Sequence, residues 1–378
     1  MSVAESTRSQ APLAPNEAIP RSMRAAVYLG DGQIAVQPVE TPSISPREIL
    51  IRVESCGVCH TDLKKIEYNL LPPPRIYGHE TAGVVAAVGD RVTQFAPGDR
   101  VIVFHHIPCG NCFYCHRRLY AQCPVYKKVG VTAGYEPAGG GFSQYVRVMD
   151  WIVERGVERI PEGVSFDQAC WVEPVNTCLK GVELLHLLPG DTVAILGQGP
   201  IGLIFTLLVR RTGATVLSTD TIPFRRDLST RFGASAFDPR EPGFEASIKA
   251  QTENRGADAV IVATNAKGLV EQALKVSRPG AKVLLFAQTS ATERIEISGA
   301  DVCVCERILL GSYSSDIDLQ AESARLVFSG ELPLEQLISH RFALEEISRG
   351  IHVAQHPGER SLKVVIHPQP LETNEERT

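Results

Sequence analysis

Four cysteines lie close together in one stretch of the chain, namely Cys109, Cys112, Cys115 and Cys123. Thiolates are preferred ligands of structural zinc, and this spacing lets all four meet around one tetrahedral ion within a single loop. An iron–sulfur cluster is the alternative, because two C-x2-C steps followed by a Cys-Pro pair are similar to a bacterial ferredoxin run. That run has about three residues before its last cysteine, whereas seven precede Cys123 here, and no second cysteine set accompanies them. The pattern therefore predicts a structural zinc with no open coordination position.

A second set of potential metal ligands is dispersed along the chain, as is typical of catalytic zinc. Such an ion takes three protein ligands and keeps one exchangeable position. Cys59, His79 and either Glu80 or Glu173 are the candidates. Each of them alone has a structural explanation, as a buried small residue, a core histidine, a turn charge or a helix start. The hypothesis of a catalytic site therefore depends on their occurrence together with a nucleotide-binding pattern.

The residues that follow Cys59 fit the oxidation of an alcohol at such a zinc. As a Lewis acid, zinc lowers the pKa of a bound hydroxyl, so that an alkoxide forms near neutral pH and its collapse to a carbonyl releases hydride. We expect Thr61 to contact the substrate oxygen and the cofactor ribose, and His60 to continue the proton relay or to face the cofactor phosphates. Asp62 suits a hydrogen bond to the unliganded nitrogen of His79, which fixes the tautomer of the ring.

A glycine-rich turn between an apolar strand at 192–196 and an apolar helix from 201 predicts a dinucleotide site. Its glycines permit a tight turn, and the free N–H groups at the helix start receive the pyrophosphate. The residues expected to bind the cofactor here are Gly197, Gly199, Pro200, Ile201 and Gly202. Asp220 closes the next apolar run, where an acidic residue accepts hydrogen bonds from the adenosine ribose. Its carboxylate would repel a 2′-phosphate, so NAD is favoured over NADP, and we assign Arg225 and Arg226 to the start of the next helix.

The composition favours a globular protein with a small-molecule partner. The chain has 378 residues, of which 44% are hydrophobic, so two domains are expected. The net charge of −5 is mild and no Lys/Arg run occurs, which argues against nucleic acid or a membrane surface as a partner. No apolar stretch reaches the roughly 18 residues that span a bilayer, and residues 1–22 lack the apolar core of a signal peptide. We therefore expect a cytoplasmic protein whose ten cysteines are reduced.

The order of the expected elements divides the chain into parts. Residues 1–22 are rich in Pro, Ser and Ala without periodicity, which predicts a flexible tail. Short β-type runs then predict an all-β lobe, with strands at 23–29, 49–55, 82–88, 100–104 and 142–149. From residue 178, strands at 192–196, 215–219, 258–262, 282–286 and 308–311 alternate with helices, which predicts a parallel, doubly wound α/β sheet. We expect the last stretch, which ends in a strand at 362–366, to return to the first lobe.

Together these motifs resemble those of the zinc-dependent medium-chain alcohol/polyol dehydrogenases, over residues 23–367. The motifs are GVCHTD at 57–62, GHE at 78–80, GDRV at 98–101, GFSQY at 141–145, the four cysteines, Glu173-Pro174 and the turn 197–202. The resemblance implies a GroES-like β-rich catalytic domain, formed by residues 23–177 and 319–378, and a Rossmann cofactor domain at 178–318. It also implies a cleft between the domains that holds the catalytic zinc, and a homodimer or homotetramer.

Within this family, Glu173-Pro174 resembles the sorbitol and threonine dehydrogenase branch, in which a glutamate takes the place of a cysteine ligand of simple alcohol dehydrogenases. In that branch the glutamate after the histidine can bind zinc directly, so Glu80 and Glu173 both stay candidates. The CHTD run at 59–62 is closer to simple alcohol dehydrogenases than to the Cys-Gly-Ser-Asp of polyol enzymes. This mixture leaves the substrate open.

The resemblance also implies roles for residues outside these motifs. The segment before the four cysteines lines the substrate pocket in the family, and here it contains His105, whose imidazole suggests a polar, hydroxyl-rich substrate. The alternative for His105 is a surface histidine. Asn176 and Tyr68 are expected to add hydrogen bonds to the substrate. Lys363 resembles a basic residue that faces the cofactor pyrophosphate, and Arg225 resembles a position near the adenine.

The sequence thus predicts an NAD-dependent dehydrogenase with two zinc ions per chain that oxidises a secondary alcohol of a polyol, sugar or related polar metabolite to a ketone. A primary alcohol or an aldehyde as substrate is the nearest alternative. A second alternative is a zinc- and NAD(H)-binding redox-sensing protein without turnover. A third is a metal-free quinone or enoyl reductase, which would not need Cys59 and His79.

Overall fold

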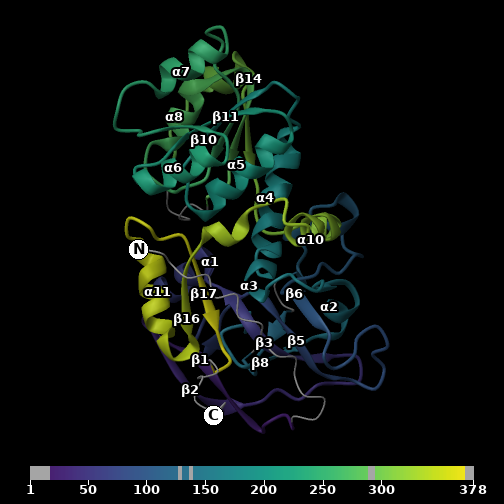
Figure 1. Cartoon of the computed structure of the whole chain (residues 1–378). Helices are drawn as coiled ribbons and strands as arrows, with labels where there is room; N and C mark the ends of the chain where they lie inside the picture. Colours follow the sequence, from purple (N-terminus) through teal and green to yellow (C-terminus); the bar gives the residue numbers. More distant parts are fainter. Residues whose placement is uncertain (1–17, 127–129, 136–138, 288–293, 371–378) are drawn as a thin grey trace.

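The computed structural model describes residues 18–126, 130–135, 139–287 and 294–370, and in this part of the chain the strands form three sheets. The elements are arranged in two parts, one above the other in Figure 1. The long helix α4 (Val172–Leu185) runs from the lower part toward the upper one, and the chain returns to the lower part after β15.

The lower part is built on a sheet with the strand order β16-β17-β3-β5-β6-β9, to which β8 and β7 are added beside β3. Its strands are β3 (Ile49–Gly57), β5 (Glu80–Val88), β6 (Arg100–Phe104), β7 (Val131–Thr132), β8 (Tyr145–Val148), β9 (Val157–Arg159), β16 (Ile338–Ala343) and β17 (Lys363–His367). A smaller sheet has the order β2-β1-β4 and contains β1 (Ser22–Gly30), β2 (Gln33–Glu40) and β4 (Arg75–Ile76). The strand β17 lies antiparallel to β3, with Val365 opposite Gly57, so the end of the chain does return to the first lobe.

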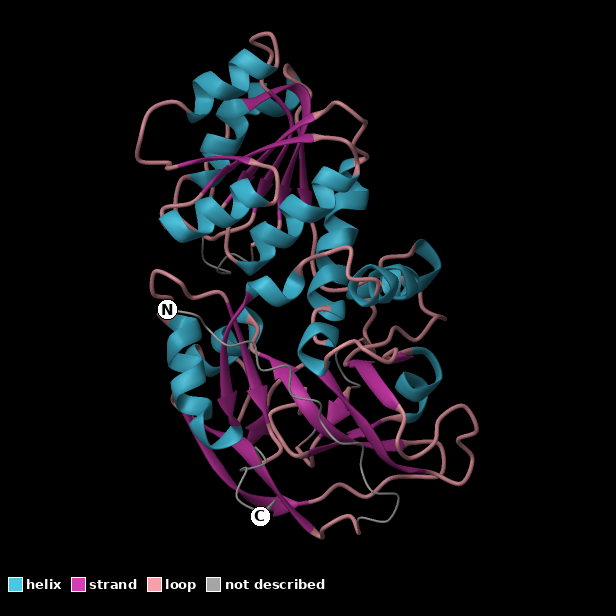
Figure 2. Cartoon of the chain, in the orientation of Figure 1, coloured by secondary structure: helices cyan, strands magenta, loops and turns pink. Residues whose placement is uncertain are grey.

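The upper part is a six-stranded parallel sheet with the order β12-β11-β10-β13-β14-β15. Its strands are β10 (Thr192–Leu196), β11 (Thr215–Thr219), β12 (Ser235–Phe237), β13 (Ala257–Val262), β14 (Ser277–Leu285) and β15 (Ile308–Gly311). All of β10 is buried, because helices cover both faces of the sheet (Figure 2). The chain switches from one side of β10 to the other between β12 and β13, and such a switch opens a ligand-binding crevice at the carboxyl ends of the strands.

Helices complete both parts. The upper sheet is flanked by α5 (Pro200–Arg211), α6 (Pro223–Arg231), α7 (Phe244–Gln251), α8 (Leu269–Val276) and α9 (Gly299–Cys303). The lower part carries α1 (His60–Glu67), α2 (Asp150–Arg155), α3 (Phe166–Ala169), α10 (Gln320–Phe328) and α11 (Ile347–Gln355). Of these, α10 packs against α3 and α4, and α11 packs against β16 and β17. Within the described ranges, no helix has both the length and the apolar character that crossing a membrane requires.

The predicted fold class is confirmed, and several strands begin and end where the sequence predicts. The predictions for β6, β10, β11 and β15 match the observed bounds. The strand expected at 142–149 is shorter, as β8, and β2 was not predicted. Residues 1–17 of the expected tail lie outside the described residues, whereas Ser22 already begins β1.

Candidate active site

Three potential metal ligands meet where β3, α1 and β5 come together. Cys59 caps the first turn of α1, directly after β3, while His79 precedes β5 and Glu80 begins it. The antiparallel register of β3 and β5 places Gly57 opposite Glu80. One ligand atom from each of Cys59, His79 and Glu80 lies within 4.8 Å of the other two. Two segments that are separate in the sequence thus bring a thiol, an imidazole and a carboxylate to one point.

Asp62 holds the His79 ring from the side opposite this point. Both side chains are buried, and Nδ1 of His79 donates a hydrogen bond to Oδ1 of Asp62 at 3.0 Å. Burial by itself would lower the pKa of His79, but the Asp62 carboxylate and the Cys59 sulfur outweigh it and raise the pKa well above its usual range. The backbone N–H of Cys59 also donates to Asp62, at 3.3 Å. The contact expected between Asp62 and His79 is therefore present, and it leaves Nε2 available for a metal.

Glu80 forms a buried ion pair with Lys363 of β17. The Lys363 ammonium also lies 5.3 Å from the centre of the Trp171 ring. Burial lowers the pKa of Lys363, but the Glu80 carboxylate and other nearby negative groups outweigh burial and leave the pKa raised. A Cβ on Gly57 would overlap Oε2 of Glu80 and lie 2.8 Å from Cε of Lys363. Glycine at this position therefore makes room for the ion pair.

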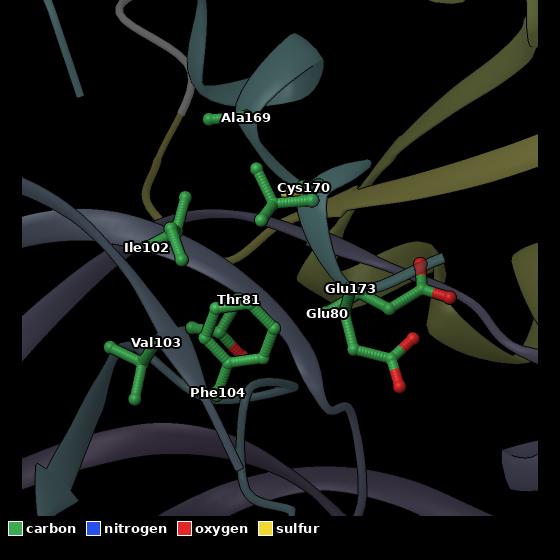
Figure 3. A pocket seen from close by; sticks show the side chains of 9 residues that line it. Glu80, Thr81, Ile102, Val103, Phe104, Ala169, Cys170 and Glu173 are labelled. Carbon is green, nitrogen blue, oxygen red and sulfur yellow. The ribbon is translucent and has the colours of Figure 1, made fainter. Parts of the chain in front are cut away.

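Glu173 lies in the first turn of α4 and lines a small pocket together with Glu80 (Figure 3). The two carboxylates point to the same side of this pocket, whose other walls include Phe104 and Cys170. Burial raises the pKa of Glu173 to about 7; His79 opposes the rise and Glu80 adds to it. Glu173 is not one of the three residues whose ligand atoms meet; among the described residues, Glu80 is the carboxylate that joins Cys59 and His79 within 4.8 Å.

The four cysteines of the 109–123 stretch converge in a cluster of their own. One ligand atom of each lies within 4.8 Å of the others, and the sulfurs of Cys112 and Cys115 are 3.5 Å apart. Burial and the neighbouring thiols raise the pKa of Cys115 to about 12, a penalty that a bound cation would remove. All ten cysteines of the chain are free thiols, as expected. Four sulfurs at these separations fit a tetrahedral zinc.

The glycine-rich turn joins the buried strand β10 to α5. Gly197 has a φ of +95°, and a Cβ there would press on the Thr264 side chain at 2.8 Å. A Cβ on Gly202 would overlap the carbonyl oxygen of Gly197, so the helix packs closely on the turn. Gly199, Pro200 and Ile201 are partly exposed at the start of α5. Unpaired N–H groups at this helix start fit the pyrophosphate of a dinucleotide.

Asp220 follows β11 beside the turn. Its Oδ2 accepts a hydrogen bond from the N–H of Gln198 at 2.7 Å, and Oδ1 accepts one from the N–H of Ile222 at 2.8 Å. These bonds fix the carboxylate while each oxygen keeps acceptor capacity for a ribose hydroxyl. Nη1 of Arg225, on α6, lies 3.9 Å from Oδ2 of Asp220. Asp220 and Arg225 therefore stand together at the turn, as the sequence predicts.

Two of the residues expected to contact the substrate have other surroundings in the structure. Asn176 is fully buried, and its amide binds the backbone of Asp316: Oδ1 accepts from the N–H at 2.7 Å, and Nδ2 donates to the carbonyl at 3.0 Å. Tyr68 ends α1 with 60% of its surface exposed. The neighbouring Glu67 carboxylate raises the pKa of its hydroxyl. Asn176 thus fastens α4 to a distant loop, and Tyr68 belongs to the surface.

Other predicted residues lie at the metal centre or around it. Lys363, expected at the cofactor pyrophosphate, is paired with Glu80, because β17 runs beside β3. His105 is buried, with its ring centre 4.7 Å from that of His79, which excludes the surface alternative. In α1, Thr61 is half-buried and His60 is exposed.

Sequence reasoning missed three contributors to this site. Nothing in the sequence marked Gly57 as the space for an ion pair or Trp171 as a partner of Lys363. Nor did the sequence indicate that the ring of His106 lies between those of His105 and Tyr126, with ring centres 4.0 and 5.2 Å away. The usable signal was that Gly57 begins the GVCHTD motif at 57–62.

Comparison with known proteins agrees with this geometry. Residues 45–158 match the family model of the alcohol dehydrogenase GroES-like domain, and residues 200–328 match that of zinc-binding dehydrogenases. A putative zinc-binding dehydrogenase from Sinorhizobium meliloti 1021, solved bound to NADP, is 30% identical with a TM-score of 0.83, over 92% of this chain and 99% of that one. The chain belongs to the zinc-dependent medium-chain alcohol/polyol dehydrogenase family. It is an oxidoreductase that acts on the CH–OH group of an alcohol with zinc and a nicotinamide cofactor.

Curated relatives of this dehydrogenase cover nearly the whole chain. Sorbitol dehydrogenase of Bacillus subtilis strain 168 is 29% identical over 93% of this chain and 98% of its own length. L-threonine 3-dehydrogenase of Pyrococcus abyssi is 29% identical over 80% of this chain and 86% of its own length. The groups present fit both cofactors: two sets of zinc-type donors, and a turn with Asp220 and Arg225 beside it.

Proposed function

We propose that this protein oxidises the secondary hydroxyl group of a polyol, a sugar or a related polar metabolite to a ketone and reduces NAD. The observation that carries the proposal is the meeting of Cys59, His79 and Glu80 within 4.8 Å, beside the pocket that also contains Glu173. A metal-free reductase on the same scaffold would have no use for such a set of ligands. A zinc- and NAD(H)-binding protein without turnover would need the metal ligands but not a relay hydroxyl such as that of Thr61, which stands two residues after Cys59.

In this proposal, Cys59 and His79, with Glu80 or Glu173, hold the catalytic zinc, and the four clustered cysteines hold the structural zinc. The catalytic zinc supplies a Lewis acid for the substrate hydroxyl, and NAD supplies the hydride acceptor. Asp62 keeps the His79 ring in the tautomer whose Nε2 is free. Lys363 balances the negative charge of Glu80, because a thiolate and two carboxylates in one buried site would otherwise repel each other.

The proton of the substrate hydroxyl leaves through α1. Thr61 is half-buried and stands two residues after the ligand Cys59, whereas His60 is exposed at the first position of the helix. A hydroxyl in the interior followed by an imidazole at the surface is an order that suits a proton relay. NAD is preferred to NADP because both oxygens of Asp220 are fixed by backbone N–H groups, so the carboxylate cannot turn away from a 2′-phosphate.

Polar secondary alcohols are the proposed substrates for two reasons. Relatives are named for sorbitol and for oxidation of threonine at carbon 3, both of which carry a secondary hydroxyl among other polar groups. The buried imidazole of His105 next to His79 offers a hydrogen-bonding group to a second hydroxyl. The 104–108 segment would then favour polyols over simple alcohols.

We further propose that residues 23–177 and 319–378 form the catalytic domain and 178–318 the cofactor domain, and that the protein is a homodimer or homotetramer. Support for the assembly comes from β15, an edge strand of the upper sheet, with exposed apolar residues in and before it. Ten free thiols, four of them in a zinc-type cluster, are consistent with work in the reducing cytoplasm.

The test is NADH formation by zinc-replete protein with NAD across a panel of polyols, sugars, amino alcohols such as threonine, and simple primary and secondary alcohols. We expect turnover on a polar secondary alcohol and a ketone product. Cys59→Ser should reduce kcat/KM by about a thousandfold or more, since the Lewis acid contributes several kcal/mol, while Cys303→Ser, at an exposed thiol, should leave it unchanged. Turnover confined to primary alcohols would contradict the substrate class; full activity without zinc would contradict the mechanism.

A further inference from the structure

A short turn of the lower part reaches the nucleotide-binding part of the molecule. Between α11 and β17, residues 358–361 fold back on themselves: the N–H of Ser361 donates to the carbonyl of Gly358 at 3.1 Å, and the N–H of Gly358 donates to Oγ of Ser361 at 3.1 Å. In Figure 1 this segment extends from the lower part toward α6. Nη2 of Arg225, on α6, donates to the carbonyl of Ser361 at 2.9 Å. The Arg360 guanidinium lies 5.7 Å from the centre of the Phe224 ring.

The other arm of Arg225 faces the nucleotide turn. Its side chain is only 14% exposed, and Nη1 lies 3.9 Å from Asp220 Oδ2 and 3.9 Å from where a Cβ of Gly199 would stand. Nε of Arg225 is buried and has no hydrogen-bond partner among the residues that the structure describes. A buried guanidinium donor without a partner is costly, and a polar ligand on the turn would satisfy it. One side chain therefore contacts the turn of the lower part and the cofactor site at the same time.

Ser361 is rigidly connected to the metal centre. Two residues later, Lys363 begins β17 and forms the ion pair with Glu80. The stretch between them is pinned on both sides by Ser339, whose Oγ accepts from the N–H of Leu362 at 2.8 Å and donates to the carbonyl of Lys363 at 3.1 Å. The N–H of Val58 donates to the carbonyl of Val364 at 2.9 Å, next to the ligand Cys59. Because these hydrogen bonds hold the stretch between them, a displacement of Ser361 should also displace Lys363.

We propose that Arg225 is a positioning residue that couples the nucleotide site to the setting of Glu80 at the catalytic metal, through the Ser361 carbonyl and Lys363. The inference rests on the proposed function, because it assumes a dinucleotide at the glycine-rich turn and a zinc at Cys59 and His79. A cofactor that engages Arg225 fixes the turn at 358–361, and this fixes Lys363 against Glu80. If bound NAD strengthens metal binding at the catalytic site by some factor, then bound metal must strengthen NAD binding by that same factor, because coupling between two sites is reciprocal.

The test compares NAD affinity in two metal states of the full-length protein. NAD binding is measured by calorimetry with both zinc ions present and again after a chelator has removed the catalytic zinc, with the zinc content determined in each sample. For the unaltered chain we expect the catalytic zinc to tighten NAD binding by roughly 5- to 50-fold. In Arg225→Lys, which keeps the charge but lacks the forked donors, the ratio between the two metal states should fall to about one.

A residue that only contacts the cofactor would behave differently, since its replacement would weaken NAD binding equally in both metal states and leave the ratio unchanged. That result, or the absence of coupling in the unaltered chain, would overturn the proposal. Arg231→Lys, exposed at the other end of the same helix, is the matched control and should retain the full ratio. Arg360→Leu removes the stacking on Phe224 and leaves Arg225 in place, so it should lower the ratio between the two metal states in part. This variant replaces Arg225→Lys in the test if Arg225→Lys does not fold.

Neither of the two NAD titrations requires turnover or a known substrate, so their outcome is separate from the assay of dehydrogenase activity. Failure of the proposed function has its own signature here: the untreated protein would carry only the zinc of the four cysteines. A second readout is amide hydrogen exchange of residues 358–364 in protein without NAD. Loss of a charge-assisted hydrogen bond should speed exchange there by about 10- to 100-fold in Arg225→Lys, with no change in Arg231→Lys.

Discussion

At position 57 the absence of a side chain determines what the metal centre can contain. A Cβ there would overlap a carboxylate oxygen of Glu80 and crowd Lys363, and both of these side chains are buried. We expect Gly57→Ala to displace Glu80 from Cys59 and His79, so that the purified protein retains about one zinc per chain instead of two. NAD should still bind, but roughly 5- to 50-fold more weakly, because the catalytic zinc that tightens it is lost. Metal analysis and calorimetry measure the two quantities.

The matched control is Gly299→Ala, because a Cβ at position 299 would meet no atom within 4 Å. This variant should keep both zinc ions. If Gly57→Ala also keeps two zinc ions, Glu80 is not needed to hold the catalytic metal, and Glu173 becomes the candidate for the carboxylate ligand.

Asp62 acts on the metal through the ring of His79. Its carboxylate accepts the Nδ1 hydrogen bond at 3.0 Å in a buried site, and this fixes the orientation of the ring, with Nε2 as the nitrogen that can bind the metal. Asp62→Asn keeps the shape but weakens this acceptor, so the affinity of the catalytic zinc should fall by about 10- to 100-fold. Competition with a chromophoric chelator measures it. Glu67→Gln, exposed on the same helix, should not change the affinity, and an equal affinity in Asp62→Asn would contradict the assignment.

At the scale of elements, what the sequence predicted depended on local patterns. Strands such as β10 are buried on both faces and bounded by turn residues, so a continuous apolar run in the sequence marks where they begin and end. The edge strand β2 is half-exposed and contains Pro38, and it gave no such signal. Among site residues, local motifs indicated Cys59, His79 and Asp62, which the structure brings together. The partners that the structure gives to Lys363 and Asn176, namely Glu80 and Asp316, were not predicted, because they are distant in the sequence and follow only from strand pairing and helix packing.

The four-cysteine lobe is fastened to the segment that follows β15. The hydroxyl of the buried Tyr126 forms hydrogen bonds with Oγ of Ser314 and of Ser315, each at 3.0 Å. Removing it in Tyr126→Phe should lower the free energy of unfolding by about 1–3 kcal/mol, because the bonds are lost in a buried place. Chemical denaturation of the zinc-replete protein measures the change.

The same experiment on Tyr114→Phe, in the same lobe but 38% exposed, provides the reference and should give a change close to zero. Both variants should keep the structural zinc, since neither tyrosine is a ligand. Equal stability of Tyr126→Phe and the unaltered chain would mean that the lobe is not anchored through this hydroxyl.

For the whole molecule, the arrangement of the upper sheet leaves one edge unprotected. In the described part of that sheet β15 is the last strand on its side, and an unpaired edge is a template for another strand. Apolar side chains are exposed in and before it: Val304 is 78%, Ile308 46% and Val302 43% exposed. A second copy, related by a twofold axis, would pair its own β15 edge with this one and cover the exposed apolar side chains. Twofold symmetry is the commonest symmetry of homo-oligomers.

The assembly through this edge can be tested with one substitution. Ile308→Lys places a charge at the start of β15, within the proposed contact, and a charge that loses water at an interface weakens it. Light scattering should show the unaltered protein at two or four times the chain mass of 41.1 kDa and the variant at half of that value. Leu188→Lys, at a residue 67% exposed elsewhere on the surface, should leave the mass unchanged. If Ile308→Lys keeps the full mass, the contact must lie on another surface, and the β15 edge is not what holds the copies together.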